Sequence, residues 1–477
     1  MQSEILENLK RCGDIQPGEK IVVAVSGGAD SVFLLHLLKK LPFQLIVAHF
    51  NHKLRENSGL DANFTKNLCA ELQVPFEEGQ GDVREFSKST KTTIEEAARI
   101  LRYRFLVSVA VDHQAEYIAV AHNANDQVET VLMHLLRGTG LSGLTGMKYG
   151  IVIEEFHPSI KIIRPILSIW RRQIEDYLYA NSLAYRLDET NSDQNYSRNK
   201  IRHRILPFLV SEYPTISTRL FQTAEVLRTD LELVDEVVSK KWQTLADIRN
   251  QGVVSFQRNE FLIENIAVQR HLLRRSVFFL QPNTRDISFT SIERVREAIA
   301  KHSAGQFDLE DNLLMELFNN RIIISAKNFH WQRFFFPQMS DVTITINQTG
   351  TYLLGENWEI LVTLQSAILD KDALKTQSEM IAELDFEVVG GFPLIIRPWK
   401  KGDRMMPLGM EGDTISIGNY FTNQKIPRGA RSNWPILLNF HGKIGWVCGL
   451  RLAHPFRITD KTEKIIRLEL NQKNMNG

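Results

Sequence analysis

The chain has 477 residues with a formal net charge of +1, and 43% of its residues are hydrophobic while 24% are charged. This composition is typical of a soluble globular protein, and the length predicts two or three domains because one core rarely grows beyond about 250–300 residues. The near-zero charge excludes nucleic-acid binding through an overall basic field, so any RNA contact must come from local clusters. Because no apolar run approaches the roughly 18 residues of a membrane helix and the N-terminal segment lacks a signal-peptide core, we expect a cytoplasmic protein with no membrane partner.

The three cysteines, Cys12, Cys69 and Cys448, lie far apart and form no C-x-x-C pair. They therefore predict neither a disulfide framework nor a cysteine-based zinc site. Their spacing also argues against chemistry that carries sulfur as a persulfide on paired cysteines. We interpret all three as buried, inert thiols.

The first part of the chain alternates strand-like and helix-like segments up to about residue 200, which predicts a parallel α/β sheet. Residues 21–25 (IVVAV) are continuously apolar, as expected of a strand that is covered on both faces. Thr93 followed by Glu96 is a capping box that opens a helix, on which Arg99, Arg102 and Tyr103 share a neighbouring face. Further strands are predicted at 45–50, 117–121 and 162–166, and further helices after residue 31 and at 58–72, 126–136 and 171–181.

The pattern changes near Pro214, and three domains are predicted. Helical periodicity covers residues 216–241, 262–280, 290–302 and 309–319, whereas apolar residues alternate with a period of two past Phe336. The predicted fold class is therefore an α/β domain with a parallel sheet, followed by a helical domain and a β-rich α+β domain. The predicted boundaries are 1–212, 213–336 and 337–477.

The sharpest local signal is a glycine loop between the first strand and its helix, formed by Ser26, Gly27, Gly28, Ala29, Asp30 and Ser31. Glycines let phosphate oxygens approach the backbone, and the N–H groups and dipole of a helix N-terminus favour an anion. The serines add hydroxyl donors, while the acidic side chain suits Mg²⁺ held against the phosphate. The loop is neither a Walker loop nor a dinucleotide fingerprint. The alternative is a strand-to-helix turn that binds no ligand.

This glycine loop matches S-G-G-x-D-S, the PP-loop of the ATP pyrophosphatases, and so resembles an adenine nucleotide alpha hydrolase-like domain. Several further motifs in the same chain resemble the tRNA(Ile)-lysidine synthetase family. The first set lies between residues 49 and 203: His49 to Arg55, Glu96 to Tyr103, Ala121 to Thr130, Arg137 to Gly140, Arg164 with Pro165, and Asn191 to His203. The second set lies in the tail: Arg397, Pro398, Gly402 to Arg404, Pro407 to Met410, Lys425 to Pro427, Arg431, and Gly449 to Arg451.

The resemblance implies an ATP- and Mg²⁺-dependent ligase. In this family ATP adenylates the C2 carbonyl oxygen of the wobble cytidine of the tRNA(Ile) with a CAU anticodon. The ε-amine of free L-lysine then attacks C2 and expels AMP. The resemblance also implies that the helical and C-terminal domains bind tRNA, and that the protein forms a homodimer.

Site residues follow from the motifs. Asp30 and Asp126 are the predicted Mg²⁺ ligands and, with Arg99 facing phosphate, the predicted catalytic residues. Asp126 has the alternative of a helix N-cap, and Arg99 that of a surface salt bridge. The predicted ATP site combines the glycine loop with Ala24, His49 and Asn51, because ligands lie at the carboxyl ends of parallel strands. The resemblance adds Gly138 of the motif Arg137 to Gly140.

The lysine site is predicted at Asp126, Glu129 and Thr130, although Glu129 has the alternative of complementing the helix dipole. The predicted tRNA contacts are Arg198, Asn199, Arg202, His203 and Arg404. Such a basic run suits an RNA backbone, and its alternative is a solvated helix face.

The chain departs from the family pattern at Asn51 and Asn125, where the family has Asp, and each replacement removes a negative charge near the triphosphate. The tail stretch 416–420 also lacks an expected Lys and Asp. Two other functions stay open: another PP-loop enzyme that modifies tRNA, such as a thiolase, and a non-catalytic protein that binds ATP.

Overall fold

The computed structural model describes residues 2–13, 15–53, 58–186, 197–282, 284, 287–310, 312–366 and 378–473. The chain divides into two compact units, Met1–Glu236 and Val237–Gly477, and the three domain boundaries stay a prediction. Leu54 and Arg55 of one family motif, and residues 191–196 of another, lie outside the described residues. Among the helices that are described, none has the length and apolar character needed to cross a membrane.

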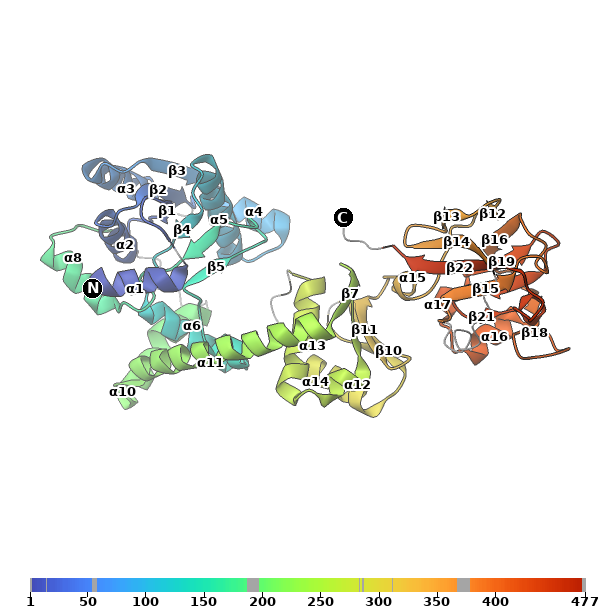
Figure 1. The fold of residues 1–477 in the computed structure, drawn as a ribbon. Helices are drawn as coiled ribbons and strands as arrows, with labels where there is room; N and C mark the ends of the chain where they lie inside the picture. Colours follow the sequence, from blue (N-terminus) through green and yellow to red (C-terminus); the bar gives the residue numbers. More distant parts are fainter. Residues whose placement is uncertain are drawn as a thin grey trace. The chain divides into compact units, whose positions relative to one another are not determined.

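A six-stranded sheet forms the centre of the first unit, in the order β3-β2-β1-β4-β6-β5 (Figure 1). All neighbouring strands are parallel except the edge strand β5, which is antiparallel to β6. The predicted parallel sheet is therefore confirmed, although β3 and β5 are too short or too polar to stand out in the sequence. The strands are β1 (Lys20–Ala24), β2 (Gln44–Asn51), β3 (Phe76–Gln80), β4 (Tyr117–Ala119), β5 (Gly150–Val152) and β6 (Lys161–Ile163).

The side chains of β1 alternate between two cores on opposite faces of this sheet. Ile21 and Val23 pack with α1, α2 and α8 on one face, while Val22 packs with α5 on the other. Both faces are buried, which explains the continuous apolar run at 21–25. The helices are α1 (Gln2–Cys12), α2 (Ala29–Lys39), α3 (Ser58–Leu72), α4 (Val83–Thr90), α5 (Ile94–Asp112), α6 (Ala124–Arg137), α7 (Leu141–Leu144), α8 (Arg171–Ala180), α9 (Ser197–Lys200), the π-helix η2 (Ile201–Ile205), α10 (Leu206–Glu212) and α11 (Ile216–Leu245).

The strand order reverses at β1, which lies between β2 and β4. The chain leaves β1 toward β2 on one side, whereas β4 pairs with β1 on the other side. The loops that follow β1 and β4 therefore start next to each other at the carboxyl edge of the sheet. In open parallel sheets this reversal point is where ligands bind.

The second unit contains a five-stranded antiparallel sheet in the order β7-β8-β11-β10-β9. The predicted helix at 309–319 is wrong, because Leu313–Phe318 forms β10 and buries every second side chain. The apolar content of this segment (LLMELF) hides its period of two. The helices predicted at 262–280 and 290–302 are confirmed. The elements are β7 (Asp247–Asn250), β8 (Val253–Gln257), α12 (Arg258–Ile263), α13 (Ile266–Leu280), α14 (Phe289–Lys301), β9 (Gly305–Asp308), β10, β11 (Arg321–Ala326) and α15 (Gln332–Phe335).

Besides the two-stranded sheet of β17 and β18, the second unit has two larger antiparallel sheets that share one core, in which Trp358 and Trp446 come from different sheets. Their strand orders are β12-β16-β19-β20-β21 and β13-β14-β22-β15. The predicted β-rich tail is thus confirmed. The elements are β12 (Ile344–Ile346), β13 (Gly350–Leu353), β14 (Trp358–Ser366), β15 (Ile381–Asp385), β16 (Leu394–Pro398), β17 (Arg404–Met405), β18 (Ile415–Ser416), α16 (Ile417–Asn423), α17 (Arg428–Arg431), β19 (Pro435–Asn439), β20 (Ile444–Val447), β21 (Arg451–Leu452), the 3-10 helix η4 (His454–Phe456) and β22 (Lys464–Gln472).

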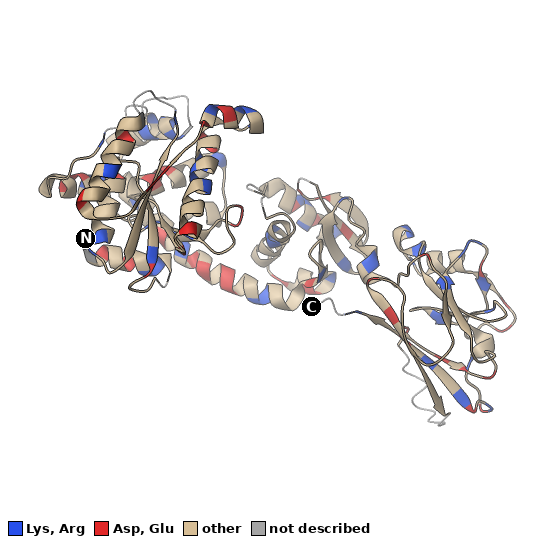
Figure 2. Cartoon of the chain, turned by 90° about the horizontal axis from the view of Figure 1, so that it is seen from above, with Lys and Arg blue, Asp and Glu red and all other residues tan. Residues whose placement is uncertain are grey.

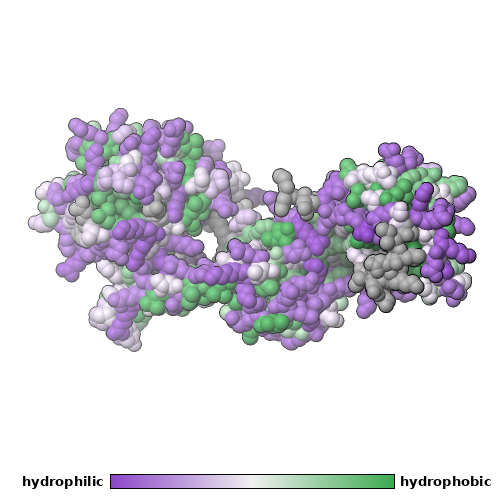
Figure 3. Space-filling model, viewed as in Figure 1, coloured by the Kyte–Doolittle hydropathy of each residue, from purple (hydrophilic) through white to green (hydrophobic). Residues whose placement is uncertain are grey.

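Charged residues of both signs are interspersed over the helices and strands, as the net charge of +1 leads one to expect (Figure 2). On the face drawn in Figure 3, hydrophilic residues cover most of the surface and apolar residues form small separate patches. The overall field is therefore weak, and a charged ligand must be bound by local groups.

Candidate functional site at the carboxyl edge of the sheet

The glycine loop leaves β1 and turns sharply into α2. Gly27 has a φ of +87°, which favours glycine, and Gly28 is the N-cap of α2 without any side-chain cap. The Ser31 hydroxyl donates to the Gly28 carbonyl (2.9 Å) and accepts from the Ser26 backbone N–H (3.2 Å), which closes the loop on itself. The uncapped N–H groups at the start of α2 can therefore bind an anion.

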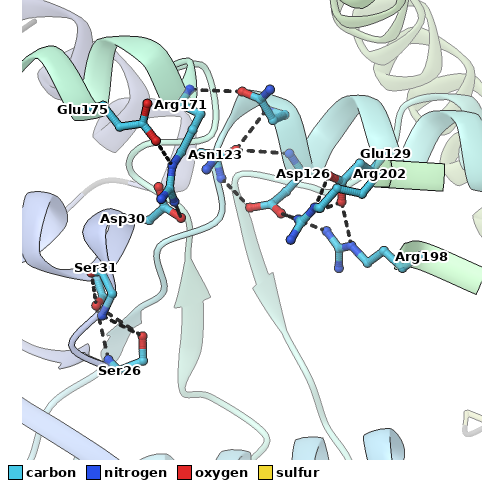
Figure 4. Close-up of polar contacts among 12 residues, drawn as sticks. Ser26, Asp30, Ser31, Asn123, Asp126, Glu129, Arg171, Glu175, Arg198 and Arg202 are labelled. Atoms are coloured by element: carbon cyan, nitrogen blue, oxygen red, sulfur yellow. Dashed lines mark hydrogen bonds and ion pairs between the residues drawn. The ribbon is translucent and has the colours of Figure 1, made fainter. Parts of the chain in front are cut away.

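Asp30 lies in the first turn of α2 and has one engaged and one unengaged carboxylate oxygen. Its Oδ2 accepts a hydrogen bond from Arg171 at the start of α8 (2.6 Å; Figure 4). Its Oδ1 is buried and has no hydrogen-bond partner among the described residues. Burial raises the pKa of Asp30 and the nearby charge of Asp126 adds to that rise, while Arg171 opposes it. The Asn123 amide also faces this carboxyl and lowers its pKa, although Oδ1 gains no hydrogen bond from it.

A buried carboxylate oxygen without a partner is costly unless a cation or a donor approaches it. Oδ1 of Asp30 therefore has the character of a metal ligand, beside a loop whose N–H groups suit phosphate. No cluster of three or more His, Cys, Asp or Glu side chains able to hold a metal occurs in the described part of the chain. Any metal at this edge would need phosphate or water oxygens in addition to protein ligands.

The loop after β4 leads into α6 through a capping box. Asn123 is the N-cap and accepts hydrogen bonds from the backbone N–H groups of Asn125 and Asp126 (2.9 and 3.1 Å). In return, Asp126 Oδ2 accepts a hydrogen bond from the Asn123 backbone N–H (3.1 Å). The alternative that Asp126 is itself the N-cap is wrong, because the helix begins two residues earlier than predicted. Its second oxygen, Oδ1, stays directed at the site.

Two acids and two arginines form an ion-pair network beside this capping box (Figure 4). Asp126 Oδ1 accepts from Arg198 (3.2 Å) and Arg202 (2.9 Å). Glu129, only 2% exposed, accepts from Arg198 (3.1 Å) and from Arg202 twice (2.5 and 2.9 Å). The two arginines are four residues apart on α9 and η2, so they reach the acids from one side. We call these four residues the acid–arginine network.

The network joins residues to which the sequence assigns different roles. Asp126 and Glu129 are the predicted lysine ligands, whereas Arg198 and Arg202 are predicted tRNA contacts. In this structure each arginine forms ion pairs with both acids, and the four formal charges sum to zero. Thr130, the third predicted lysine ligand, is buried and donates its hydroxyl to the Asp126 carbonyl one turn back (2.8 Å).

The remaining predicted ATP residues are distributed unevenly. Ala24 ends β1, and the buried His49 on β2 bonds through Nδ1 to the Val25 carbonyl (2.8 Å), so both lie at the carboxyl edge. Asn51 ends β2. Gly138, by contrast, is the C-cap of α6, about 18 Å along that helix from Asp126 at 1.5 Å per residue. The structure therefore does not place Gly138 with the others.

The two Asn replacements have backbone partners. Asn51 Oδ1 accepts from the Lys53 N–H (2.9 Å), and Asn125 Oδ1 accepts from the Arg171 N–H at the start of α8 (3.0 Å). Asn125 thus orients the helix turn whose arginine bonds Asp30. A carboxylate is not needed for either contact, because an amide oxygen accepts the same hydrogen bond.

The other predicted tRNA contacts lie on three different elements. Asn199 is on α9 and His203 is exposed on η2. Arg404 is exposed on β17 and donates to the Thr414 hydroxyl and carbonyl (3.1 and 2.8 Å). Arg171 and Asn123 were not predicted as site residues. The only signal for them in the sequence is their position: Arg171 is the first residue of α8, and Asn123 directly precedes α6.

The fold and this edge define an ATP-binding protein of the PP-loop class. A family model described as a PP-loop domain matches residues 1–209, and one described as the TilS substrate C-terminal domain matches residues 394–470. A tRNA(Ile)-lysidine synthase of Geobacter sulfurreducens is 33% identical over 453 residues, which cover 94% of this chain and 92% of that protein. One of Clostridium perfringens is 30% identical, covering 99% of this chain and 100% of that protein.

The chain therefore belongs to the tRNA(Ile)-lysidine synthase family, as its motifs predict. It is a ligase that forms a carbon–nitrogen bond in tRNA modification. A solved structure titled as the TILS C-terminal domain is also similar, at 25% identity and a TM-score of 0.25, covering 28% of this chain and all of that one.

Proposed function

We propose that this chain joins L-lysine to C2 of the wobble cytidine of the tRNA(Ile) with a CAU anticodon. The cytidine O2 attacks the α-phosphorus of ATP, and the bond to the β-phosphate breaks to release pyrophosphate. The lysine ε-amine then forms a bond to C2, the C2–O2 bond breaks, and AMP leaves while the amine gives up a proton. The observation that carries the proposal is the unengaged Oδ1 of Asp30 beside an uncapped helix N-terminus.

ATP and Mg²⁺ fit the carboxyl edge in complementary ways. The glycine loop would donate backbone N–H groups to the phosphates, with Ala24, His49 and Asn51 beside the nucleoside. Asp30 would hold Mg²⁺. Asp126 is the second proposed ligand, and its Oδ1 would have to give up its hydrogen bonds from Arg198 and Arg202 to bind the ion. Two carboxylates are enough, because Mg²⁺ in nucleotide sites completes its shell with phosphate oxygens and waters. Bound there, the ion neutralises charge on the departing pyrophosphate.

The lysine amine would bind at Asp126 and Glu129. An ammonium group and a guanidinium group compete for the same carboxylate oxygens, so lysine must share or displace bonds now made by Arg198 and Arg202. A network whose charge is already balanced holds an ammonium less firmly than two bare acids would. This favours the neutral amine, which is the form that attacks.

A thiolase function is disfavoured by the cysteines. All three are free and buried, and burial raises the pKa of Cys12 and of Cys69 to about 11. The pKa of Cys448 is raised further by complete burial. A sulfur-carrying cysteine needs a thiolate that is accessible to its partner, and none of these environments supplies one.

The rest of the proposal concerns partners. The tRNA would contact Arg198, Asn199, Arg202, His203 and Arg404, with Arg99 facing a phosphate. We also propose that the three predicted domains exist as such, that the enzyme forms a homodimer, and that it works in the cytoplasm, where tRNA, ATP and lysine occur together.

The test is to incubate the full chain with unmodified tRNA(Ile) transcript, ATP and Mg²⁺, with either isotope-labelled lysine or sulfide. Mass analysis of the anticodon nucleosides should find labelled lysine on the wobble cytidine together with release of pyrophosphate. The methionine tRNA with the same anticodon is the matched control. Sulfur incorporation would favour the thiolase, and ATP binding without any pyrophosphate release would favour a non-catalytic protein.

A further inference from the structure

Three arginines near the ends of β4 and β6 have no acidic partner among the described residues. Arg99 and Arg102 come from α5, and Arg164 directly follows β6. None of them forms an ion pair with a carboxylate in the parts of the chain that the structure describes, in contrast to Arg171, Arg198 and Arg202. We call Arg99, Arg102 and Arg164 the arginine cluster.

Arg164 is the most unusual member because it is only 8% exposed. Its guanidinium donates to the Lys148 carbonyl (2.7 Å) and to Nδ1 of His122 (3.3 Å), and both acceptors are neutral. Arginine keeps its charge in proteins, and a buried charge is normally paired. The positive charge of Arg164 is therefore hydrogen-bonded but not neutralised.

Arg99 and Arg102 lie against the same aromatic ring. Each guanidinium carbon is 5.4 Å from the centre of the Tyr103 ring. The Nε of Arg102 is buried and has no hydrogen-bond partner among the described residues. The ring supports both arginines without removing their charge, and a donor remains unused.

Two neutral histidines, His122 and His52, lie close to these arginines. His122 Nδ1 accepts a hydrogen bond from Arg164 (3.3 Å), and the charges of Arg198, Arg102 and Arg99 are near enough to act on the same ring. Burial lowers the pKa of His122, and the arginine charges lower it further. Burial likewise lowers the pKa of His52 to about 4, with Arg102 contributing. The histidines thus stay neutral, and the acids of the neighbouring network are already bound to Arg198 and Arg202.

We propose that Arg99, Arg102 and Arg164, with His122 beside them, bind a phosphate group through side chains that do not belong to the glycine loop. Planar guanidinium groups match phosphate oxygens in pairs, and several arginines around one site without an acid repel each other until an anion arrives. This proposal rests on the proposed function, which offers two sources of that chemistry. One is a backbone phosphate of the tRNA near the modified base, and the other is the polyphosphate of ATP.

The test uses Arg102→Gln and Arg99→Gln, with Arg104→Gln as the matched control. Arg104 is on the same helix but exposed and set against Phe86, so its loss removes equal charge from another face. Binding of unmodified tRNA(Ile) transcript is measured across salt concentrations, and binding of ATP and of pyrophosphate by equilibrium dialysis. Arg164→Lys adds a variant that keeps the buried charge but loses the paired geometry.

If the site takes an RNA phosphate, Arg102→Gln weakens tRNA binding by about 3- to 10-fold and lowers the slope of log affinity against log salt by about 0.7–0.9, while ATP binding stays unchanged. If it takes a nucleotide phosphate, the affinities for ATP and pyrophosphate fall by a similar factor and tRNA binding is kept. Equal affinities for all three ligands in Arg99→Gln, Arg102→Gln and the Arg104→Gln control would overturn the proposal. These are binding measurements, so an absence of lysine incorporation by the unaltered chain would refute the proposed function without deciding this site.

Discussion

Arginines from the same family motifs have different surroundings in the two units. In the second unit Arg397 donates to both oxygens of Asp403 (2.8 and 2.9 Å). Arg431 donates twice to the Ile426 carbonyl (2.9 and 2.7 Å), and Arg451 donates to the Leu408 carbonyl (3.0 Å). Each of these arginines holds a loop of its own domain. In the first unit the arginine cluster has no acid to hold among the described residues.

The difference separates two uses of arginine that a motif alone does not distinguish. A guanidinium bound to its own domain fixes a loop and contributes to the free energy of unfolding. A guanidinium without an acid leaves repulsion in the free protein, and that repulsion is relieved when an anion binds. The acid–arginine network is intermediate, because its charges are balanced by residues that the proposed reaction also uses.

The largest expected effect is at Asp30. One of its carboxylate oxygens has no partner among the described residues, so we expect this side chain to bind a ligand and not to stabilise the fold. Asp30→Ala should lower tRNA-dependent pyrophosphate release by about 10²- to 10³-fold or more, because a charge-stabilising group at the departing pyrophosphate is lost. Release of labelled pyrophosphate measures this, with the melting temperature as a check on folding. Arg171→Gln is the control, since it removes the ion pair but keeps the carboxylate. Turnover retained in Asp30→Ala would contradict the metal role.

The second effect should divide the two halves of the reaction. Glu129→Gln keeps the shape of a buried side chain but removes the charge that Arg198 and Arg202 contact. We expect lysine incorporation to fall by about 10²-fold, the low end of what loss of a positioned catalytic acid or base costs, while tRNA-dependent pyrophosphate release changes only a few-fold. Loss of a charged hydrogen-bond acceptor should also cost about 1–3 kcal/mol in the free energy of unfolding.

Rapid-quench measurement of both steps in Glu129→Gln provides the readout, and His134→Gln is a control on the same helix, because its ring bonds the Gly143 carbonyl (2.8 Å) and not the acid–arginine network. Equal losses in pyrophosphate release and in lysine incorporation would place Glu129 in nucleotide chemistry instead.

The sequence predicts the parallel sheet and the glycine loop well because both depend on local patterns. The run at 21–25 must be apolar throughout, and a loop of this composition between strand and helix has few other conformations. The β-strands between 247 and 326 are harder, since β10 is apolar at nearly every position and its period is hidden. Pairing with β9 and β11 decides that segment, and pairing is not local.

The site is predicted in its members but not in their pairing. Asp30, Asp126 and Glu129 are found from motifs, yet nothing in the sequence says that Arg198 and Arg202, about 70 residues later, close on the two α6 acids. The contact of Arg171 with Asp30 is also not predictable from the sequence, because it depends on the start of α8 lying opposite the start of α2. Gly138 illustrates the reverse error of position: it follows a site motif directly, but a whole helix separates it from Asp126.

A third prediction concerns the arginines that bind groups of their own domain, with the Arg397–Asp403 pair as the example. Asp403 is nearly buried, and burial alone would raise its pKa, but hydrogen bonds from Arg397 and the Lys400 N–H lower it overall. A lowered folded pKa means that this stabilisation is present above the unfolded value of about 3.9 and is lost as the pH falls toward the folded value. Asp403→Asn should cost about 1–3 kcal/mol at pH 7.

Urea unfolding at pH 7 and pH 3.5 checks this prediction. The unaltered chain should lose more stability between the two values than Asp403→Asn does, because the variant lacks the titrating group. Lysine incorporation at saturating tRNA should be unchanged at pH 7. Identical pH dependence of the free energy of unfolding in both proteins would mean that the Arg397–Asp403 pair does not stabilise the folded chain.

The smallest effect is expected at Arg404, which is exposed and, among the described residues, donates hydrogen bonds to Thr414 alone. Arg404→Gln should change the free energy of unfolding by no more than about 0.5 kcal/mol. If it contacts a tRNA phosphate, tRNA binding weakens by about 2- to 5-fold and the salt slope falls by about 1. Filter binding at several salt concentrations measures both, with Lys443→Gln on the same unit as a control for charge. If the slope of log tRNA affinity against log salt concentration is unchanged in Arg404→Gln, this arginine does not contact a tRNA phosphate. Its role would then be like that of Arg397: it holds a loop of its own domain, here through its hydrogen bonds to Thr414.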